Sequence, residues 1–297
     1  MKCLLSFSSL LRLPRNGFSL FERRPFHPTK AREEKPGEGN RAVECCKVQG
    51  EEIRGRRQIK AGLRQCWQLR FSICLACWLT PATPAVHAAD NELTSAEKKD
   101  GWLLLFDGQT LNGWMTSEAK PSRRPVEQSC MNPHQCGHYM MVHTQQWSNF
   151  VLTLDFKISK GCNSGIFVRT ASLTPRLGKD VGYNGIEVQI LDSTTADYYD
   201  TGAIYDLSRP TKNAMKPVGD WNHIQITCAG NIIDVVLNGE KVNHMDLDQF
   251  TEPNKRPDGT THKFDVAYNK HPRTGYIGLQ DHGADCWFKN IKLRPLS

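Results

Sequence analysis

The sequence predicts an all-β protein, an antiparallel β-sandwich or jelly roll. Residues 150–159 (FVLTLDFKIS) alternate apolar and polar side chains, which is the period of a strand with one buried face. Asn238-Gly239 separates two further apolar runs, and this pair is typical of the type I′ turn of a β-hairpin. No segment after residue 101 shows the helical period that a crossover between parallel strands needs, so the sheets are expected to be antiparallel.

Turn residues divide the rest of this region into short runs of the same kind, about ten or eleven strands in all. The expected strands, besides 150–159, are 102–106, 139–143, 165–169, 185–191, 201–205, 221–228, 232–237, 240–242, 276–280 and 287–293. No sequence repeat accompanies them, which argues against a propeller or solenoid. We therefore expect one jelly-roll domain over residues 101–297, preceded by a polar lead-in at residues 90–100.

The charge of the chain is divided between two regions. The 297 residues carry a formal net charge of +7, but residues 1–89 hold 16 Lys and Arg against 7 Asp and Glu, whereas residues 90–297 hold 22 against 24. The positive charge is therefore N-terminal, and the predicted domain has no basic footprint for nucleic acid. It also lacks a phosphate-binding glycine-rich loop and a Gly-x-Ser-x-Gly elbow.

Residues 66–89 have the order of parts of a secretory signal peptide. An apolar run at 71–79 (FSICLACWL), too short to span a membrane, follows a basic stretch and precedes Val86-His87-Ala88, which suits cleavage after Ala88. We expect an exported protein, periplasmic or extracellular, with no membrane span after cleavage. Residues 1–65 are expected to be a disordered basic extension whose assigned start codon lies too early, and a long cytoplasmic extension is the competing interpretation.

Five cysteines follow residue 90, and an odd number leaves at least one free thiol. Cys130 and Cys136 are the best candidates for a local disulfide, because the proline-containing loop between them is able to turn back on itself. Together with His134, His138 and His143 they fit no standard zinc spacing. No cofactor is predicted, and a requirement for a divalent metal is left open.

Three of the expected strands carry polar or aromatic side chains on the face opposite their apolar one. The side chains on this predicted polar wall are Phe167, Arg169, Glu187, Gln189, Tyr276 and Gln280, with Asp281 and His282 at its rim. Aromatic rings stack on sugar faces while amides and charges bind hydroxyls, so the wall predicts a carbohydrate cleft. The stacking candidates are Phe167, Tyr183, Tyr205 and Tyr276. The alternative is an ordinary solvated face with a stabilising cross-strand pair between Arg169 and Glu187.

Several blocks of sequence form an ordered set. They are LFDGQTLNGW at 105–114, NSGIFVR at 163–169, GIEVQILD at 185–192, TGAIY at 201–205, WN at 221–222, LNG at 237–239 and GLQDHG at 278–283. In this order they resemble the 3-keto-disaccharide hydrolase-like domain family over residues 101–296. The resemblance implies a concanavalin A-like lectin/glucanase jelly roll and an enzyme that cleaves glycosides already oxidised to a ketone at C3. Residues 121–138 depart from the family pattern, which puts the substrate specificity in question.

The resemblance also implies roles for the residues of the polar wall. A ketone at C3 acidifies the proton on C2; once a base removes it, the enolate expels the C1 substituent and water adds afterwards. Glu187 or His282 would be the base, and Asp281 would orient His282. Arg169 and Gln189 would stabilise the developing negative charge. The residues expected to bind substrate are Gln189, Gln280, Tyr205, Tyr183, Tyr276 and Phe167.

Three other functions stay open at this point. Two-carboxylate glycosidase chemistry needs a second acidic residue on the wall, and the strand pattern supplies only Glu187. A non-catalytic carbohydrate-binding module would use the same fold and the same aromatic residues. A structural or adhesion domain would have an empty or closed cleft.

Overall fold

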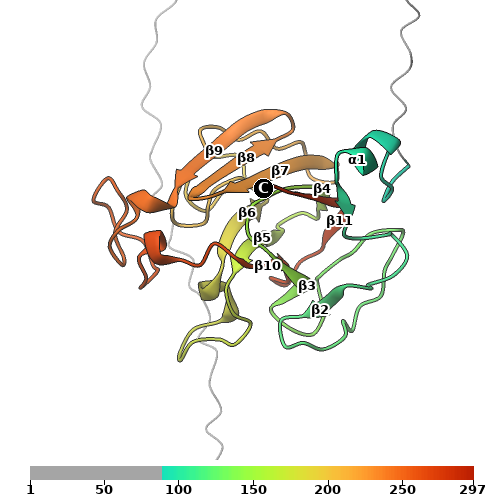
Figure 1. Cartoon of the computed structure of the whole chain (residues 1–297), viewed down its shortest axis with the longest axis horizontal. Helices are drawn as coiled ribbons and strands as arrows, with labels where there is room; N and C mark the ends of the chain where they lie inside the picture. Colours follow the sequence, from blue (N-terminus) through green and yellow to red (C-terminus); the bar gives the residue numbers. More distant parts are fainter. Residues whose placement is uncertain (1–88) are drawn as a thin grey trace, which may run out of the picture. The chain divides into compact units, whose positions relative to one another are not determined.

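The structure is a computed structural model that describes residues 89–297. The predicted basic extension and nearly all of the predicted signal peptide lie outside these residues. Two antiparallel sheets face each other in the described part, so the predicted all-β antiparallel sandwich is confirmed (Figure 1). No helix among residues 89–297 combines the length and the apolar character needed to cross a membrane.

The first sheet has six strands and the second has five. The six-stranded sheet has the order β1 (Leu103–Leu104), β11 (Cys286–Pro295), β4 (Phe150–Ile158), β7 (Asn222–Ala229), β8 (Ile232–Leu237) and β9 (Glu240–Asp246). The five-stranded sheet has the order β2 (Trp114–Thr116), β3 (Met140–Trp147), β10 (Gly275–Gln280), β5 (Asn163–Thr170) and β6 (Ile186–Leu191). The short helical elements are α1 (Ser95–Lys99), η1 (Val181–Asn184), η2 (Leu247–Gln249) and η3 (Tyr268–Lys270). The predicted strand at 201–205 forms only isolated bridges, through Ile204.

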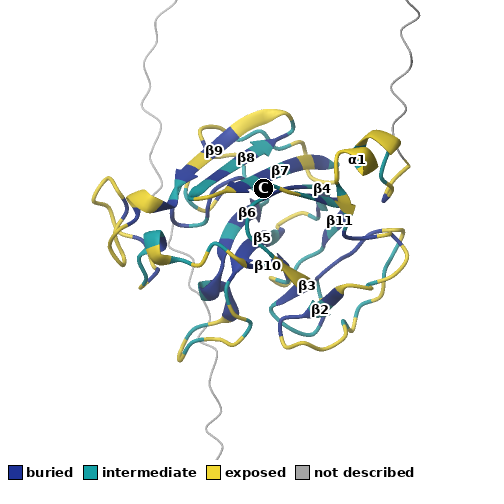
Figure 2. Cartoon of the chain, viewed as in Figure 1, coloured by how far each residue is buried: buried dark blue, intermediate teal, exposed yellow. Residues whose placement is uncertain are grey.

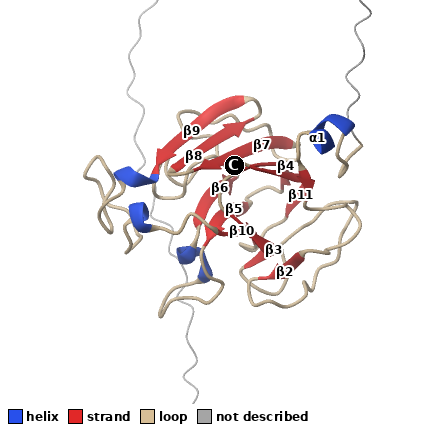
Figure 3. Ribbon diagram, viewed as in Figure 1, coloured by secondary structure: helices blue, strands red, loops and turns tan. Residues whose placement is uncertain are grey.

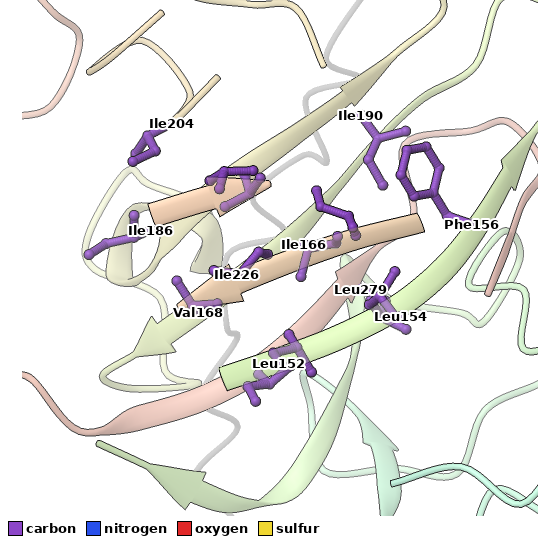
Figure 4. Packing of buried hydrophobic residues seen from close by; sticks show 14 of the residues in the cluster. Leu152, Leu154, Phe156, Ile166, Val168, Ile186, Ile190, Ile204, Ile226 and Leu279 are labelled. Atoms are coloured by element: carbon purple, nitrogen blue, oxygen red, sulfur yellow. The ribbon is translucent and has the colours of Figure 1, made fainter. Parts of the chain in front are cut away.

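The core fills the space between the two sheets, and the alternation seen in the sequence explains it. Every second residue of β4, from Phe150 to Ile158, is buried. Ile166, Ile186 and Leu279 approach from the facing sheet (Figure 4). Burying each such side chain contributes about 1.5–3 kcal/mol, which makes this interface the main source of stability.

The Asn238-Gly239 turn joins β8 to β9 as the sequence predicts. Both residues have positive φ angles, 51° and 86°, which is the backbone conformation of a type I′ turn. This hairpin completes the far edge of the six-stranded sheet.

Residues 90–100 are more than a polar lead-in, because they form α1 and attach to β11. Thr94 and Glu97 form a reciprocal capping box at the start of α1. Glu97 also accepts a hydrogen bond from Lys292 at 2.8 Å, and Asp90 pairs with Lys289 at 2.6 Å. The helix has no buried residue and is solvent-exposed over most of its surface (Figure 2), so polar contacts hold the segment in place.

The expected disulfide between Cys130 and Cys136 is wrong, because all five cysteines of the described region are free and buried. Both residues belong to the long irregular connection between β2 and β3 (Figure 3). The Cys130 thiol donates to the Gln128 carbonyl and the Cys136 thiol donates to the His138 carbonyl. This connection is held instead by backbone bonds between Met131 and Phe288 of β11.

Candidate active site

The candidate site lies on the outer face of the five-stranded sheet, the side turned away from the core. In β6, Ile186, Val188 and Ile190 point into the core, so Glu187 and Gln189 point outward. Phe167 of β5 lies opposite Glu187, in a small second cluster separate from the main core. The predicted orientation of Glu187 and Gln189 therefore holds, and strand pleating is the reason.

A glycine on β5 makes room for the Glu187 carboxyl. A Cβ atom at Gly165 would lie only 2.3 Å from Glu187 Oε1, so this carboxyl lies directly over the glycine. Gly165 is opposite Gln189 in β6, and the pairing of Leu279 with Ile166 places Gln280 of β10 on its other side. The carboxyl consequently lies between the two glutamines.

The environment of Glu187 makes its carboxyl hard to ionise. Burial raises the pKa of Glu187 to about 8, and the negative charge of Asp180 adds to this effect while Lys263 opposes it. A carboxyl with this pKa exchanges a proton readily near neutral pH, which is the property of a general acid or base.

The two glutamines beside Glu187 each have one satisfied and one unsatisfied group. Gln189 Nε2 donates to Asn163 Oδ1 at 3.1 Å, and Gln280 Nε2 donates to the Tyr139 hydroxyl at 2.9 Å. The Oε1 atom of each glutamine is buried with no hydrogen-bond partner. A buried acceptor without a partner costs roughly 1–3 kcal/mol, so a ligand hydroxyl that donates to these oxygens would recover this energy.

Two residues that the sequence analysis missed complete this cluster. The pKa of Tyr139 is raised far above its ordinary value, first by burial and then by Glu187 and Asp180, so its hydroxyl stays protonated. Lys263 Nζ lies 4.3 Å from the centre of the Tyr205 ring and 5.1 Å from that of Tyr183. Lys263 belongs to an irregular segment between β9 and β10, for which the sequence offers no periodic signal.

The predicted stacking residues separate into different groups. Tyr205 and Tyr183 lie together around Lys263, and burial raises the pKa of Tyr205 to about 12. Phe167 is only 1% exposed and packs edge to face on Tyr139, so it is a floor under the site rather than a stacking surface. Tyr276 pairs with Thr170 at the end of β10 farthest from Gln280.

The predicted place of Arg169 on the polar wall is wrong. Arg169 has a φ of 51°, and this left-handed residue interrupts the alternation of β5. Its guanidinium group is fully buried and donates to the carbonyls of Ser148 and Gly230, at 3.1 and 2.8 Å. Arg169 therefore ties together the β3–β4 and β7–β8 turns and does not reach Glu187.

The predicted pairing of Asp281 with His282 is also wrong. Asp281 Oδ1 lies 3.2 Å from His134 Nδ1, and its Oδ2 accepts a hydrogen bond from the Gln135 backbone at 2.8 Å. His282 is exposed in the turn after β10, two residues beyond Gln280. The irregular β2–β3 connection supplies His134, so only the tertiary structure creates this contact.

Two hollows lie near these residues. A polar cavity of about 780 Å³ is lined by Arg123, His134 and Asp281, among others. A smaller pocket of about 390 Å³ lies beside Tyr183 and is also lined by Arg176 and Lys270. Within residues 89–297, no three His, Cys, Asp or Glu side chains are grouped in a way that could hold a metal ion.

A β-sandwich that presents a titratable carboxyl among amides and aromatic rings defines a class of protein, the glycosidase-like β-sandwich enzymes. The chain belongs to the family described as the 3-keto-alpha-glucoside-1,2-lyase-like domain, whose model matches residues 101–294. The family predicted from the sequence blocks is thereby confirmed, and so is the predicted class of enzyme, a hydrolase.

Individual relatives agree with this family. A "3-keto-disaccharide hydrolase" of Bacteroides thetaiotaomicron is 26% identical over 288 residues, which cover 85% of this chain and 97% of the relative. A crystal structure from Parabacteroides distasonis, provisionally assigned as a glycosyl hydrolase, is 32% identical and superposes with a TM-score of 0.54 over 66% of this chain and 99% of that one. A second such structure from the same organism is 24% identical, with a TM-score of 0.59 over 70% and 100% of the two chains, and it supports the fold.

Proposed function

We propose that the protein cleaves the glycosidic bond of 3-keto-glycosides by elimination followed by addition of water, with Glu187 as the base. The observation that carries this proposal is the Glu187 carboxyl, which lies over Gly165 with a pKa raised to about 8. The relative named a 3-keto-disaccharide hydrolase supports the substrate class.

The reaction needs one group that first accepts and then returns a proton. Ionised Glu187 takes the proton from C2; the electrons of that bond form a C2–C3 double bond, and the C3 oxygen becomes an enolate. Collapse of the enolate restores the ketone, forms a C1–C2 double bond and breaks the bond from C1 to the leaving oxygen, which takes up the proton from Glu187. Water then adds to C1 and a proton returns to C2, so the balance is that of hydrolysis.

The neighbours of Glu187 suit the other requirements of this reaction. The Lys263 ammonium and the Tyr139 hydroxyl are the donors we assign to the developing enolate oxygen. The unpaired Oε1 atoms of Gln189 and Gln280 are the acceptors we assign to sugar hydroxyls. Fixed donors and acceptors of this kind orient the C2–H bond toward the base.

The test is to incubate the purified protein with a 3-keto-disaccharide and to follow the release of free sugar. The Glu187→Gln variant is expected to lose turnover by about 10²–10⁴-fold, the usual contribution of a general base. In the wild-type protein kcat/KM is expected to fall as the pH drops below about 8, because the base must be ionised. Exchange of the C2 hydrogen with deuterated solvent reports the base step separately.

Glu240→Gln is the matched control, because Glu240 is an exposed carboxyl on β9 in the other sheet. Its turnover should equal that of the wild type. Full activity in Glu187→Gln together with loss in His282→Ala would transfer the role of base to His282. Glycan binding with no turnover of any 3-keto-glycoside would instead identify a carbohydrate-binding module.

Export through the predicted signal peptide is part of this proposal. The expected first residue of the mature protein is Ala89 or Asp90, read by mass spectrometry of the protein secreted by its host. Peptides from residues 1–60 in the mature protein would contradict it.

A further inference from the structure

A group of positive charges surrounds Tyr183 next to the candidate site. Lys179 Nζ lies 4.6 Å from the centre of the Tyr183 ring and Lys263 Nζ lies 5.1 Å from it. Arg176 and Lys270 line the pocket of about 390 Å³ on which Tyr183 also borders. Two ammonium groups therefore lie over the Tyr183 ring, and two further cationic side chains line the pocket that borders on it.

Three of these four cations have no carboxylate partner among the described residues. Arg176 pairs with Asp265 at 2.8 Å. Lys179, Lys263 and Lys270 form no ion pair with any residue between 89 and 297. The pocket also contains His271, whose pKa is lowered to about 4 by burial, so this histidine is neutral and adds no charge.

The carboxyls nearby balance only part of this charge. Asp265 pairs with Arg176 and also feels the charge of Lys179, and Asp180 is the acidic neighbour of Glu187. Glu187 itself is largely protonated at neutral pH, because its pKa is raised to about 8. Residues 90–297 hold 22 Lys and Arg against 24 Asp and Glu, so the accumulation of unpaired lysines is local and does not reflect a basic domain.

We propose that the pocket beside Tyr183 binds an anionic leaving sugar, one that carries a carboxylate or a sulfate. This inference rests on the proposed function, because the keto-sugar would occupy the site at Glu187 and the leaving group would extend past Lys263. Tyr183 borders on the pocket and also lies beside Lys263, so the pocket adjoins the Lys263 side of the candidate site. Tyr183 forms part of the pocket wall, and the ammonium groups bind the anion.

The physical reason is the energy of like charges held together. Ammonium groups gathered on one ring repel each other, and an anion placed among them relieves that repulsion while it forms charge-assisted hydrogen bonds. A neutral sugar would leave the lysines unpaired. The pocket is thus expected to discriminate by charge, whereas Gln189 and Gln280 recognise hydroxyls.

The experiment compares 3-keto-glucosides that share one linkage and differ only in the leaving sugar: glucose, glucuronate or glucose 6-sulfate. At low salt we expect a kcat/KM at least about tenfold higher for the two anionic substrates, and a preference that shrinks as salt is added. The Lys179→Gln/Lys270→Gln double variant should lose this preference about tenfold or more while it keeps the wild-type rate on the glucose substrate. The ratio of the glucuronate and sulfate rates identifies the preferred anion.

Lys98→Gln/Lys99→Gln is the control, since both are exposed lysines on α1 and their loss changes the total charge as much as the double variant does. It should leave the preference intact. Equal rates for all three substrates, or a preference that the double variant retains, would overturn the inference while turnover of the glucose substrate upholds the proposed function. If no substrate is turned over, the proposed function fails, and calorimetric binding of the glucuronate glycoside against the glucose glycoside still decides the inference.

Discussion

The two faces of the five-stranded sheet differ in how completely their buried groups are satisfied. On the inner face, Ile166, Ile186 and Ile190 are completely buried, and their side chains are wholly apolar, so they require no hydrogen-bond partner. On the outer face, two buried glutamine oxygens lack hydrogen bonds and the Glu187 carboxyl is hard to ionise. Burial of the inner face stabilises the fold. The outer face instead keeps the two glutamine oxygens and the Glu187 carboxyl in an unfavourable environment that a bound ligand would relieve. Such a difference within one sheet marks the functional surface.

The largest expected effect comes from a substitution on the inner face. Ile190→Ala should reduce the free energy of unfolding by about 2–5 kcal/mol, because it removes buried methyl groups and leaves a cavity. Denaturant unfolding measures the change. Turnover per folded molecule should be unchanged, and a large loss of kcat with full stability would contradict the separation of the two faces.

The next effect is the loss of folding stability that follows when the buried Glu187 carboxyl ionises. The folded state raises the pKa of Glu187 from 4.5 to about 8, so between these values it binds more protons than the unfolded state. Stability should therefore fall as the pH rises from about 4.5 to 8, by on the order of 5 kcal/mol in full. Unfolding curves of Glu187→Gln should lack this fall. The two proteins should differ most at pH 8 and above, and parallel curves would show that Glu187 is not the group responsible.

A smaller effect is expected from a substitution that moves the Glu187 carboxyl without removing it. The Gly165→Ala methyl would lie 2.3 Å from Glu187 Oε1, so the carboxyl must shift. Turnover is expected to fall about 10²-fold, the typical cost of a misplaced catalytic group, while stability changes little. Ile166→Val, the neighbouring change on the inner face, should cost about 0.5–1.5 kcal/mol of stability and leave turnover unchanged. Normal turnover in Gly165→Ala would mean that the carboxyl position over the glycine is not required.

Local pattern was enough to predict the sandwich and part of the site. Alternation in β6 placed Glu187 and Gln189 on one face because a pleated strand has a period of two whatever surrounds it. The Asn238-Gly239 turn was equally local, since two consecutive positive φ angles favour these residue types.

The two-residue alternation of a strand gave the wrong position for Arg169, because its left-handed backbone breaks that period. Nothing in the surrounding sequence predicts this conformation. The partner of Asp281 was equally hidden. His134 is distant in the chain and reaches Asp281 only through the irregular β2–β3 connection. Contacts of this kind depend on how loops pack, which short-range periodicity does not encode.

The sequence by itself determined the fold class, the family and the face that carries Glu187, because strand period, turn residues and the order of the motifs depend only on residues close together in the chain or on their order. Only the tertiary structure decided what surrounds that carboxyl. Gly165 comes from β5, Tyr139 is the last residue of the irregular β2–β3 connection and Lys263 comes from another irregular segment. They meet at Glu187 through sheet pairing and loop packing. The raised pKa of Glu187 is a property of that enclosure, since burial is its first cause and burial exists only in the folded chain.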